Sequence, residues 1–223
     1  MMDWWSVFDW MGTVAFAISG AVLGITRNMD IFGIIVLAVS VAVGGGMVRD
    51  VLIGVTPPNA LAQPTDLLLA VGTAVFLSLT YGFLNLTNRR RRVFQDLYDF
   101  SDTVGLASFT VTGTTAGLTA APDSPYFVLP VTLGLITAVG GGVIRDLMAQ
   151  RMPVVLHMDV YAVAAIIGAV VMCWINEFFS ITAAAWFCFL TVLILRFSAI
   201  YYGWQLFHPN HGIRIHKENQ KKP

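Results

Sequence analysis

Seven apolar segments of about 20 residues or more dominate this chain of 223 residues. A helix needs about 20 mainly apolar residues to cross the roughly 30 Å hydrocarbon core of a bilayer. The segments cover residues 6–25, 30–55, 67–87, 100–120, 126–149, 158–178 and 180–203. Charged residues make up only 12% of the chain, about half the share of a typical soluble domain. The sequence therefore predicts an all-α membrane protein with seven transmembrane helices.

Basic residues gather on one predicted face of the membrane. If the N-terminus is external, ten of the thirteen Lys and Arg residues fall in cytoplasmic links or in the C-terminal tail. These ten are Arg27, Arg89, Arg90, Arg91, Arg92, Arg151, Arg214, Lys217, Lys221 and Lys222. The external links carry acidic residues instead, namely Asp3, Asp66, Asp123 and Glu177. Because cytoplasmic loops are enriched in Lys and Arg, we expect an external N-terminus and a cytoplasmic C-terminus.

Two stretches of the chain repeat each other in order. Residues 9–24 read DWMGTVAFAISGAVLG and residues 102–117 read DTVGLASFTVTGTTAG, with an aspartate and three glycines at matching positions. Further on, VAVGGGMVRDVL at 41–52 matches TAVGGGVIRDLM at 137–148. Each copy holds three predicted spans, and an odd number of spans inserts the second copy in the opposite orientation. The predicted plan is an inverted 3+3 repeat followed by one extra helix.

This repeat divides the chain into four predicted parts. Residues 1–88 form the first three-helix repeat, and residues 100–178 form the second, inverted one. A basic cytoplasmic loop at 89–99 joins the two, and residues 179–223 hold the seventh helix and a basic tail. The four arginines of the loop are most simply topology determinants, but they are also candidates for contact with anionic lipid headgroups.

The motif GGG-x-x-R-D occurs once in each copy, within an apolar segment. Its glycines are Gly44, Gly45, Gly46, Gly140, Gly141 and Gly142. Each glycine weakens a helix by roughly 1 kcal/mol relative to alanine, so the triplets predict a break or kink in helices 2 and 5 near mid-membrane. Exposed backbone at that depth is tolerated only inside protein or beside a water-filled cavity. The alternative is that the glycines only permit close helix packing.

Each motif also places two charges in the membrane, where an ionised side chain costs at least a few kcal/mol. The charges are Arg49, Asp50, Arg145 and Asp146. Neighbours at i and i+1 do not face one another on a helix, so we expect partners on other helices. By depth, Asp9 suits Arg49 and Asp102 suits Arg145. The rival geometry crosses the copies and pairs Arg49 with Asp146 and Arg145 with Asp50.

These features support two interpretations. In one, the broken helices and paired charges line a hydrophilic path, because discontinuous helices in corresponding positions mark transport sites. In the other, the charges are buried salt bridges that only hold helices together. Ser19 and Thr112 belong to a group of hydroxyl side chains that either line such a path or bond to backbone carbonyls of their own helices. The sequence shows no spacing typical of a metal site.

The duplicated GGG-x-x-R-D, the opening D-x-x-G-T-x-A-F-A-x-S-G at 9–20 and the layout of three, three and one spans resemble prokaryotic TRIC proteins, the trimeric intracellular cation channels. The same bacterial group is also catalogued as a glycine-transporter-type domain. The resemblance covers roughly residues 5–205. It implies a homotrimer in a prokaryotic inner membrane, with one pore in each protomer for potassium and other monovalent cations. It also implies that kinked helices 2 and 5 line that pore with the two motifs, and it implies no cofactor and no nucleic-acid partner.

The residues themselves favour transport without naming the solute. A passive monovalent-cation channel is the leading hypothesis, and a secondary transporter of glycine or another small solute is the alternative, since inverted repeats are typical of transporters. The chain has no TVGYG-like carbonyl filter, which gives no support for strong selection of potassium over sodium. It has neither HExxH nor GxSxG, so we do not expect an enzyme.

Overall fold

The computed structural model describes residues 4–82, 88–122, 127–156 and 160–204 and shows an all-α protein. Within these ranges it has eight α-helices and one short 3-10 helix, η1. In chain order they are α1 (Trp4–Thr26), α2 (Ile31–Leu52), α3 (Asn59–Ala62), α4 (Thr65–Gly82), α5 (Asn88–Ala120), α6 (Val128–Met148), η1 (Val154–Leu156), α7 (Tyr161–Asn176) and α8 (Ile181–Tyr202).

Seven of these helices overlap the seven predicted apolar segments, and α3 is an additional short turn. Four of them, α1, α2, α6 and α8, are long and apolar enough to cross a membrane, whereas α4 and α7 are shorter apolar helices. Helix α5 differs from the prediction because it begins at Asn88 and has 33 residues. The basic segment 89–99, expected as a loop, is helical because its Arg, Gln and Leu residues favour a helix and it contains no Gly or Pro.

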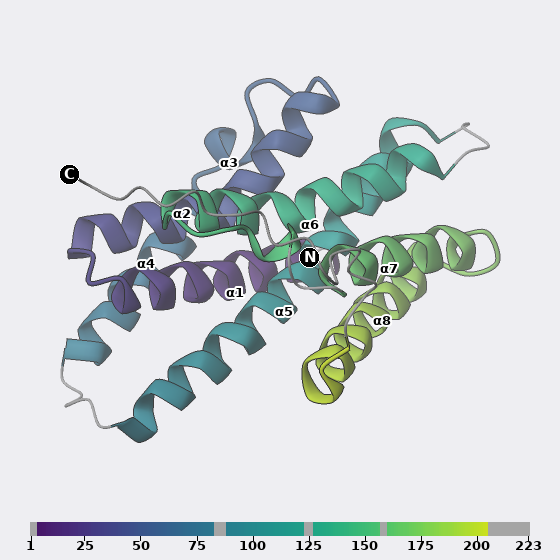
Figure 1. The fold of residues 1–223 in the computed structure, drawn as a ribbon. Helices are drawn as coiled ribbons and strands as arrows, with labels where there is room; N and C mark the ends of the chain where they lie inside the picture. The colour runs from purple at the N-terminus through teal and green to yellow at the C-terminus, as the bar shows by residue number, and fades with distance from the viewer. Residues whose placement is uncertain (1–3, 83–87, 123–126, 157–159, 205–223) are drawn as a thin grey trace, which may run out of the picture.

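The four helices that carry the duplicated sequences form the centre of the molecule (Figure 1). Helix α1 packs on α2 and α5, and α6 packs on α5 and α2. Helix α4 covers the first copy by packing on α1 and α2, and α7 covers the second by packing on α6 and α5. Helix α8 packs on α7 and α5. Each copy therefore contributes two inner helices and one covering helix.

The glycine triplets do not interrupt their helices, so the predicted break is absent, whereas the predicted kink stays a prediction. Helices α2 and α6 are continuous α-helices through both triplets. A Cβ atom at Gly45 would lie 2.2 Å from the carbonyl oxygen of Thr137, and one at Gly141 would lie 2.3 Å from that of Val41. The two helices thus cross backbone to backbone. This close packing between small residues offsets the low helix propensity of glycine.

The crossing also shows that the two copies face each other across a common centre. Val41 and Thr137 occupy equivalent positions in the two copies, as do Gly45 and Gly141, so the two glycine contacts are reciprocal.

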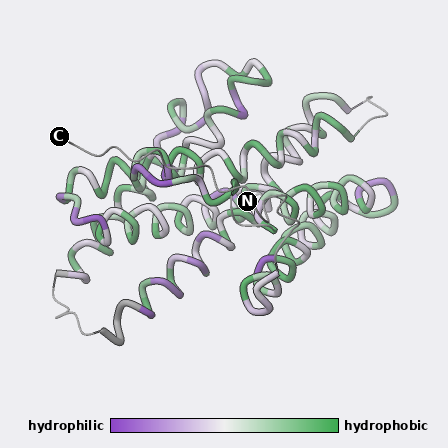
Figure 2. Tube along the Cα trace, in the orientation of Figure 1, coloured by the Kyte–Doolittle hydropathy of each residue, from purple (hydrophilic) through white to green (hydrophobic). Residues whose placement is uncertain are grey.

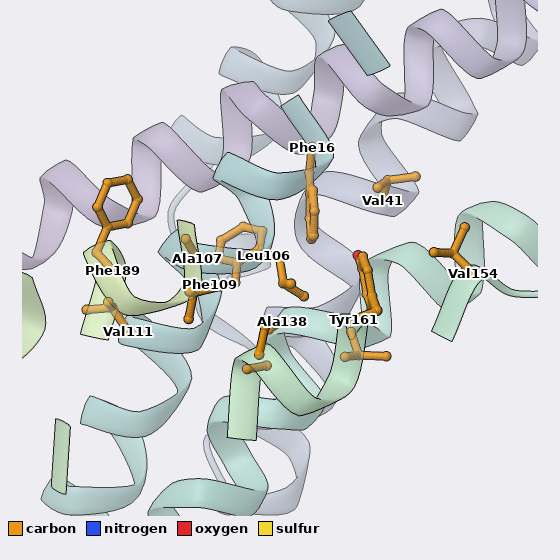
Figure 3. Close-up of a cluster of buried hydrophobic side chains, with 14 of the residues drawn as sticks. Phe16, Val41, Leu106, Ala107, Phe109, Val111, Ala138, Val154, Tyr161 and Phe189 are labelled. Carbon is orange, nitrogen blue, oxygen red and sulfur yellow. The ribbon is translucent and has the colours of Figure 1, made fainter. Parts of the chain in front are cut away.

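The aromatic residues at the centre also make reciprocal contacts between equivalent positions of the two copies. Phe16 and its counterpart Phe109 meet edge to face with ring centroids 5.2 Å apart. Each ring lies against the glycine of the other copy, Phe109 against Gly12 and Phe16 against Gly105. Figure 3 shows these rings with Leu106 in the buried centre. The internal repeat of the sequence is therefore also a repeat of contacts.

The outward faces of the helices are apolar, as a bilayer requires. Large exposed side chains include Phe32 on α2, Phe76 on α4 and Ile194 on α8. Figure 2 shows hydrophobic residues along most of the bundle and hydrophilic residues along the first part of α5. Cys173 and Cys188 are buried free thiols, and such cysteines pack as small hydrophobic residues.

Candidate functional site

The arginine and the aspartate of the first motif lie near the end of α2 and are bonded to each other. Nε and Nη2 of Arg49 donate to Oδ1 of Asp50 at 2.9 and 2.8 Å. The other carboxylate oxygen of Asp50 accepts the backbone N–H of Asn59 at 2.8 Å, at the start of α3. The prediction that neighbouring Arg and Asp do not pair is wrong. Their Cβ atoms diverge, but the long arginine side chain folds back to reach the carboxylate.

The second motif makes the same two contacts. Nε of Arg145 donates to Oδ1 of Asp146 at 2.9 Å, and Oδ2 of Asp146 accepts the backbone N–H of Val154 at 2.7 Å. In addition, Nη1 of Arg145 bonds to the carboxylate of Asp102 on α5 and donates to Oγ of Ser19 on α1 at 3.0 Å. The predicted pairing of Arg145 with Asp102 is confirmed. All charged members of this group are buried.

Two residues outside the motif brace this second pair. Nε of Arg151 donates to Oδ1 of Asp146 at 2.8 Å, and its Nη2 bonds to the hydroxyl of Tyr98. The Tyr98 ring lies beneath both guanidinium groups, 4.8 Å from Arg145 and 5.1 Å from Arg151. We call Tyr98, Asp102, Arg145, Asp146 and Arg151 the second-copy cluster. It ties α5, α6 and the segment after α6 together.

A third intramembrane arginine borders this cluster. Arg196 on α8 is buried, and its guanidinium stacks over the ring of Tyr161, 4.8 Å from the centroid. The Tyr161 hydroxyl and Nη2 of Arg145 have no hydrogen-bond partner. Sequence reasoning did not assign a role to Tyr98, Tyr161, Arg151 or Arg196. The only signal was that Arg196 is a third arginine inside an apolar segment.

The first motif faces a cavity instead of a cluster. The first-copy cavity has a volume of about 290 Å³ and lies between α1, α2, α3 and the start of α4. Its polar lining comprises Ser6, Asp9, Thr13, Arg49, Asp50, Asn59, Gln63, Thr65 and Asp66, and its apolar lining comprises Trp5, Trp10, Ala42, Val43, Gly46, Ala60 and Phe109. A volume of this size holds several water molecules. Three carboxyl groups against one guanidinium give its wall an excess of acidic groups.

Asp9 lies in this cavity without the partner that we expected. Its carboxyl group shares the cavity lining with that of Asp66. Among the described side chains no ion pair joins Asp9 to Arg49, and Nη1 of Arg49 is buried without a hydrogen-bond partner. The rival crossed pairings, Arg49 with Asp146 and Arg145 with Asp50, do not form either.

The remaining predicted site residues divide between the cavity, the cluster and the helix contacts. Gly46 lines the cavity. Gly44 lies against Ile144, and Gly140 lies against Gly45, at the helix crossing. The Cβ position of Gly142 is 3.2 Å from the Tyr161 hydroxyl.

The two predicted hydroxyl residues lie apart from the cavity wall. Ser19 joins the second-copy cluster as an acceptor. Thr112 is buried and donates to the carbonyl of Phe109 at 3.4 Å. The side chains of Arg89, Arg90 and Arg91 lie outside the described residues.

The cavity does not continue to the second-copy cluster. Thr13 and Phe109 belong to its lining, and Phe109 meets the fully buried ring of Phe16. None of the five cluster residues lines the cavity. Within the described part of the chain, no group of three or more His, Cys, Asp and Glu side chains is placed to hold a metal ion. The site is thus a polar cavity, and one of its lining rings, Phe109, contacts the central ring of Phe16.

Comparison with known proteins places this arrangement in a family. The model of the family described as "Glycine transporter" matches residues 6–82 and 99–177, one match for each copy of the repeat. The chain belongs to this family. Its relatives include the UPF0126 inner membrane protein YadS of Escherichia coli, 34% identical over 96% of this chain and 98% of the relative. The UPF0126 membrane protein YvgT of Bacillus subtilis is 31% identical over 95% and 98%.

Solved structures extend the comparison. A prokaryotic TRIC channel crystallised in 0.5 M KCl superimposes with a TM-score of 0.81 at 29% identity, over 91% of this chain and 98% of that chain. The TRIC trimeric intracellular cation channel orthologue from Rhodobacter sphaeroides gives 0.79 at 31% identity, over 90% and 98%. The resemblance to prokaryotic TRIC proteins is confirmed, and this family member is a multi-pass membrane protein with their fold.

Proposed function

We propose that the protein is a monovalent-cation channel, permeable to potassium, with a pore through each protomer of a homotrimer. The observation that carries the proposal is the first-copy cavity, a polar space with three carboxyl groups set into an apolar helix bundle. Clefts lined by one sign of charge concentrate ions of the opposite sign. The similarity to solved TRIC cation channels, at about 30% identity, supports the same function.

We further propose the topology predicted from the charge distribution. Residues 1–88 and 100–178 are then inverted repeats of three spans, 179–223 hold the seventh helix and tail, and the N-terminus is external. Under this topology the first-copy cavity opens to the outside and the second-copy cluster lies at the cytoplasmic side. Arg89–Arg92 then lie beside the cytoplasmic leaflet, where anionic lipid headgroups attract basic side chains.

The pore would run from the cavity past the two central rings to the second-copy cluster. Phe109 and Phe16 interrupt this route at the centre, and the bonds of Arg145 close it at the cytoplasmic side. Under the proposed topology we take this arrangement as a non-conducting state that is open only to the outside. Conduction requires the rings to separate and Arg145 to move away from Asp102.

The test is potassium current through purified full-length protein in planar bilayers. Replacing both cavity carboxyls, Asp9→Asn with Asp66→Asn, is expected to lower the single-channel potassium current about threefold or more, because the cavity loses its cation-attracting groups. Glu177→Gln is the matched control, since Glu177 is an exposed carboxylate outside the cavity. Absence of unitary currents in the wild type, or equal loss in variant and control, would contradict the proposal.

A secondary transporter of glycine or another small solute is the second candidate. Two observations favour it: the family model is described as a glycine transporter, and the cavity is polar and does not include the charged cluster of the second copy in its lining. Saturable, gradient-driven glycine uptake into liposomes without unitary currents would select this candidate over the channel.

A further inference from the structure

The end of the bundle that holds the second-copy cluster contains an arginine without a counter-charge. Arg196 lies on α8, inside an apolar span, and only 3% of its surface is exposed. Its guanidinium stacks over the Tyr161 ring, but among the described side chains it makes no ion pair, and its Nε is buried without a hydrogen-bond partner. Intramembrane arginines are normally paired, because an uncompensated buried charge is strongly destabilising. The described side chains do not supply this partner.

The charges around Arg196 leave one cation in excess. Three guanidinium groups face two carboxylates in this region, namely Arg145, Arg151 and Arg196 against Asp102 and Asp146. Asp99 on α5 does not restore the balance, because it is only half-buried, accepts hydrogen bonds from Gln95 and forms no ion pair with Arg196. The first-copy cavity has the opposite balance, with three carboxyl groups against Arg49. One end of the bundle is therefore rich in anionic groups and the other in cationic groups.

Two further hydrogen-bonding groups close to Arg196 are buried without a partner. They are the hydroxyl of Tyr161, whose ring lies under the Arg196 guanidinium, and Nη2 of Arg145. Both lie beside the same glycine: the Cβ position of Gly142 is 3.2 Å from the Tyr161 hydroxyl and 3.6 Å from Nη2 of Arg145. Figure 3 shows Tyr161 among the buried side chains of the centre. Two donors from α6 and α7 therefore converge on one buried position.

The glycine at this position is not required by the helix crossing. At Gly141 an added Cβ atom would lie 2.3 Å from the carbonyl oxygen of Val41, so the neighbouring backbone excludes a side chain. At Gly142, outside its own helix, the only described atoms within 4 Å of the Cβ position belong to Tyr161 and Arg145. Glycine at 142 thus keeps a side chain away from the two unpartnered donors, and helix packing does not explain it.

We infer that these groups bind one small monatomic anion of the halide class, such as chloride, at a position beside Gly142 that we call the Gly142 site. Nη2 of Arg145 and the Tyr161 hydroxyl donate to the ion, and Arg196 balances its charge from the face of the Tyr161 ring. A halide accepts hydrogen bonds and donates none, which matches a site made of donors. A water molecule would satisfy the donors but would leave the excess cation. The inference does not rest on the proposed function.

Thermal unfolding of the purified full-length protein in detergent tests the Gly142 site. Potassium concentration and ionic strength are held constant while gluconate, an anion too large for an enclosed site, is replaced by chloride or bromide. We expect the melting temperature to rise by about 4 °C or more and to saturate, because a ligand that binds only the folded state stabilises it by mass action. An unchanged melting temperature would overturn the inference.

Arg196→Met removes the excess charge and keeps a long side chain. It should abolish the halide response, and in gluconate its melting temperature should equal or exceed that of the wild type, because an unpaired buried charge is gone. Arg27→Met is the matched control, since Arg27 is an exposed arginine in the link between α1 and α2. It should keep the full response. Equal responses in the two variants would overturn the inference, because the halide would then act at another place.

Two further variants locate the ion. Gly142→Ala places a methyl group against both donors and should abolish the response, whereas Gly46→Ala, the equivalent change in the first copy, should keep it. Tyr161→Phe should lower the melting temperature in chloride, where it removes a donor to the ion, but not in gluconate, where the hydroxyl has no partner. A full halide response in Gly142→Ala would overturn the assignment of the ion to this position.

Two last measurements separate the halide from other partners of Arg196. Asp159 is the carboxylate nearest to Tyr161 in sequence and lies outside the described residues. A halide response in Asp159→Asn but not in the wild type would overturn the inference, because Asp159 would then be the counter-ion. Crystals grown in potassium bromide should show anomalous scattering beside Gly142, and an ordered water in its place would overturn the inference as well. Because neither measurement records a current, these results are separate from the bilayer test of cation conduction.

Discussion

The centre of the molecule is nearly symmetric, whereas its two charged ends differ. Cβ atoms added at Gly45 and Gly141 would lie at almost the same distance from a carbonyl oxygen of the opposite helix, at 2.2 and 2.3 Å. Arg49 and Arg145 occupy equivalent positions but make different sets of bonds. Backbone in direct contact permits one geometry, while a long charged side chain can reach several acceptors. The comparison indicates that the helix crossing is the fixed part of the fold and that the charged ends are the adjustable part.

The largest expected loss of stability comes from a change at the crossing of α2 and α6. Gly45→Ala places a methyl group 2.2 Å from the carbonyl oxygen of Thr137 and should destabilise the protein by about 3 kcal/mol or more, because neither helix backbone can move away. Gly72→Ala in α4 is the matched control. No atom lies within 4 Å of its Cβ position, so the gain in helix propensity should stabilise by about 1 kcal/mol. Thermal unfolding in detergent measures both, and similar melting temperatures would refute the fixed crossing.

A difference in unfolding free energy distinguishes the charged ends of the two copies. Asp102→Asn removes a carboxylate from a fully buried arginine and should cost about 3 kcal/mol of unfolding free energy. Asp9→Asn, the equivalent change in the first copy, should cost less than about 1 kcal/mol, because Asp9 has no arginine partner in this conformation. Equal losses in denaturant-induced unfolding would mean that Asp9 is already paired with Arg49.

The smallest expected effect separates two buried tyrosines beside the same arginine. Tyr98→Phe removes the acceptor for Arg151 and should cost about 1.5 kcal/mol, the value of a hydrogen bond to a charged group. Tyr161→Phe should be neutral or slightly stabilising, since the Tyr161 hydroxyl is buried without a partner. Melting curves of the two variants in one halide-free detergent solution give the difference, and a reversed order would show that the Tyr161 hydroxyl has an essential partner.

Much of the fold could be read from the sequence because the bilayer imposes a length and a polarity on each span. Segment lengths predicted the positions of seven helices, and the repeat predicted which helices are equivalent. The pairing of Arg145 with Asp102, expected from depth beside the rival crossed geometry, is confirmed. The same argument failed for Arg49 and Asp9, because equal depth does not decide which of several nearby carboxylates a long side chain reaches.

Other features could not be predicted for definite physical reasons. A glycine triplet has the same sequence whether it interrupts a helix or brings two helices into contact, and only the partner backbone shows the contact. The rule that residues i and i+1 diverge describes the directions of their Cβ atoms. The side chain of Arg49 is long enough to fold back and reach Asp50 all the same. Tyr98 and Arg151 lie in segments that the sequence analysis treated as links between spans. They are 53 positions apart, and no sequence pattern indicated their contact.

Helix α5 has a mechanical consequence. With 33 residues it is about 50 Å long, well beyond the roughly 30 Å thickness of the hydrocarbon core. It begins at Asn88, directly before the four arginines. Asp102 lies on the same uninterrupted rod, 14 positions further along. A torque applied to the arginine-bearing end therefore turns the carboxylate that holds Arg145, with no flexible joint between them to absorb it.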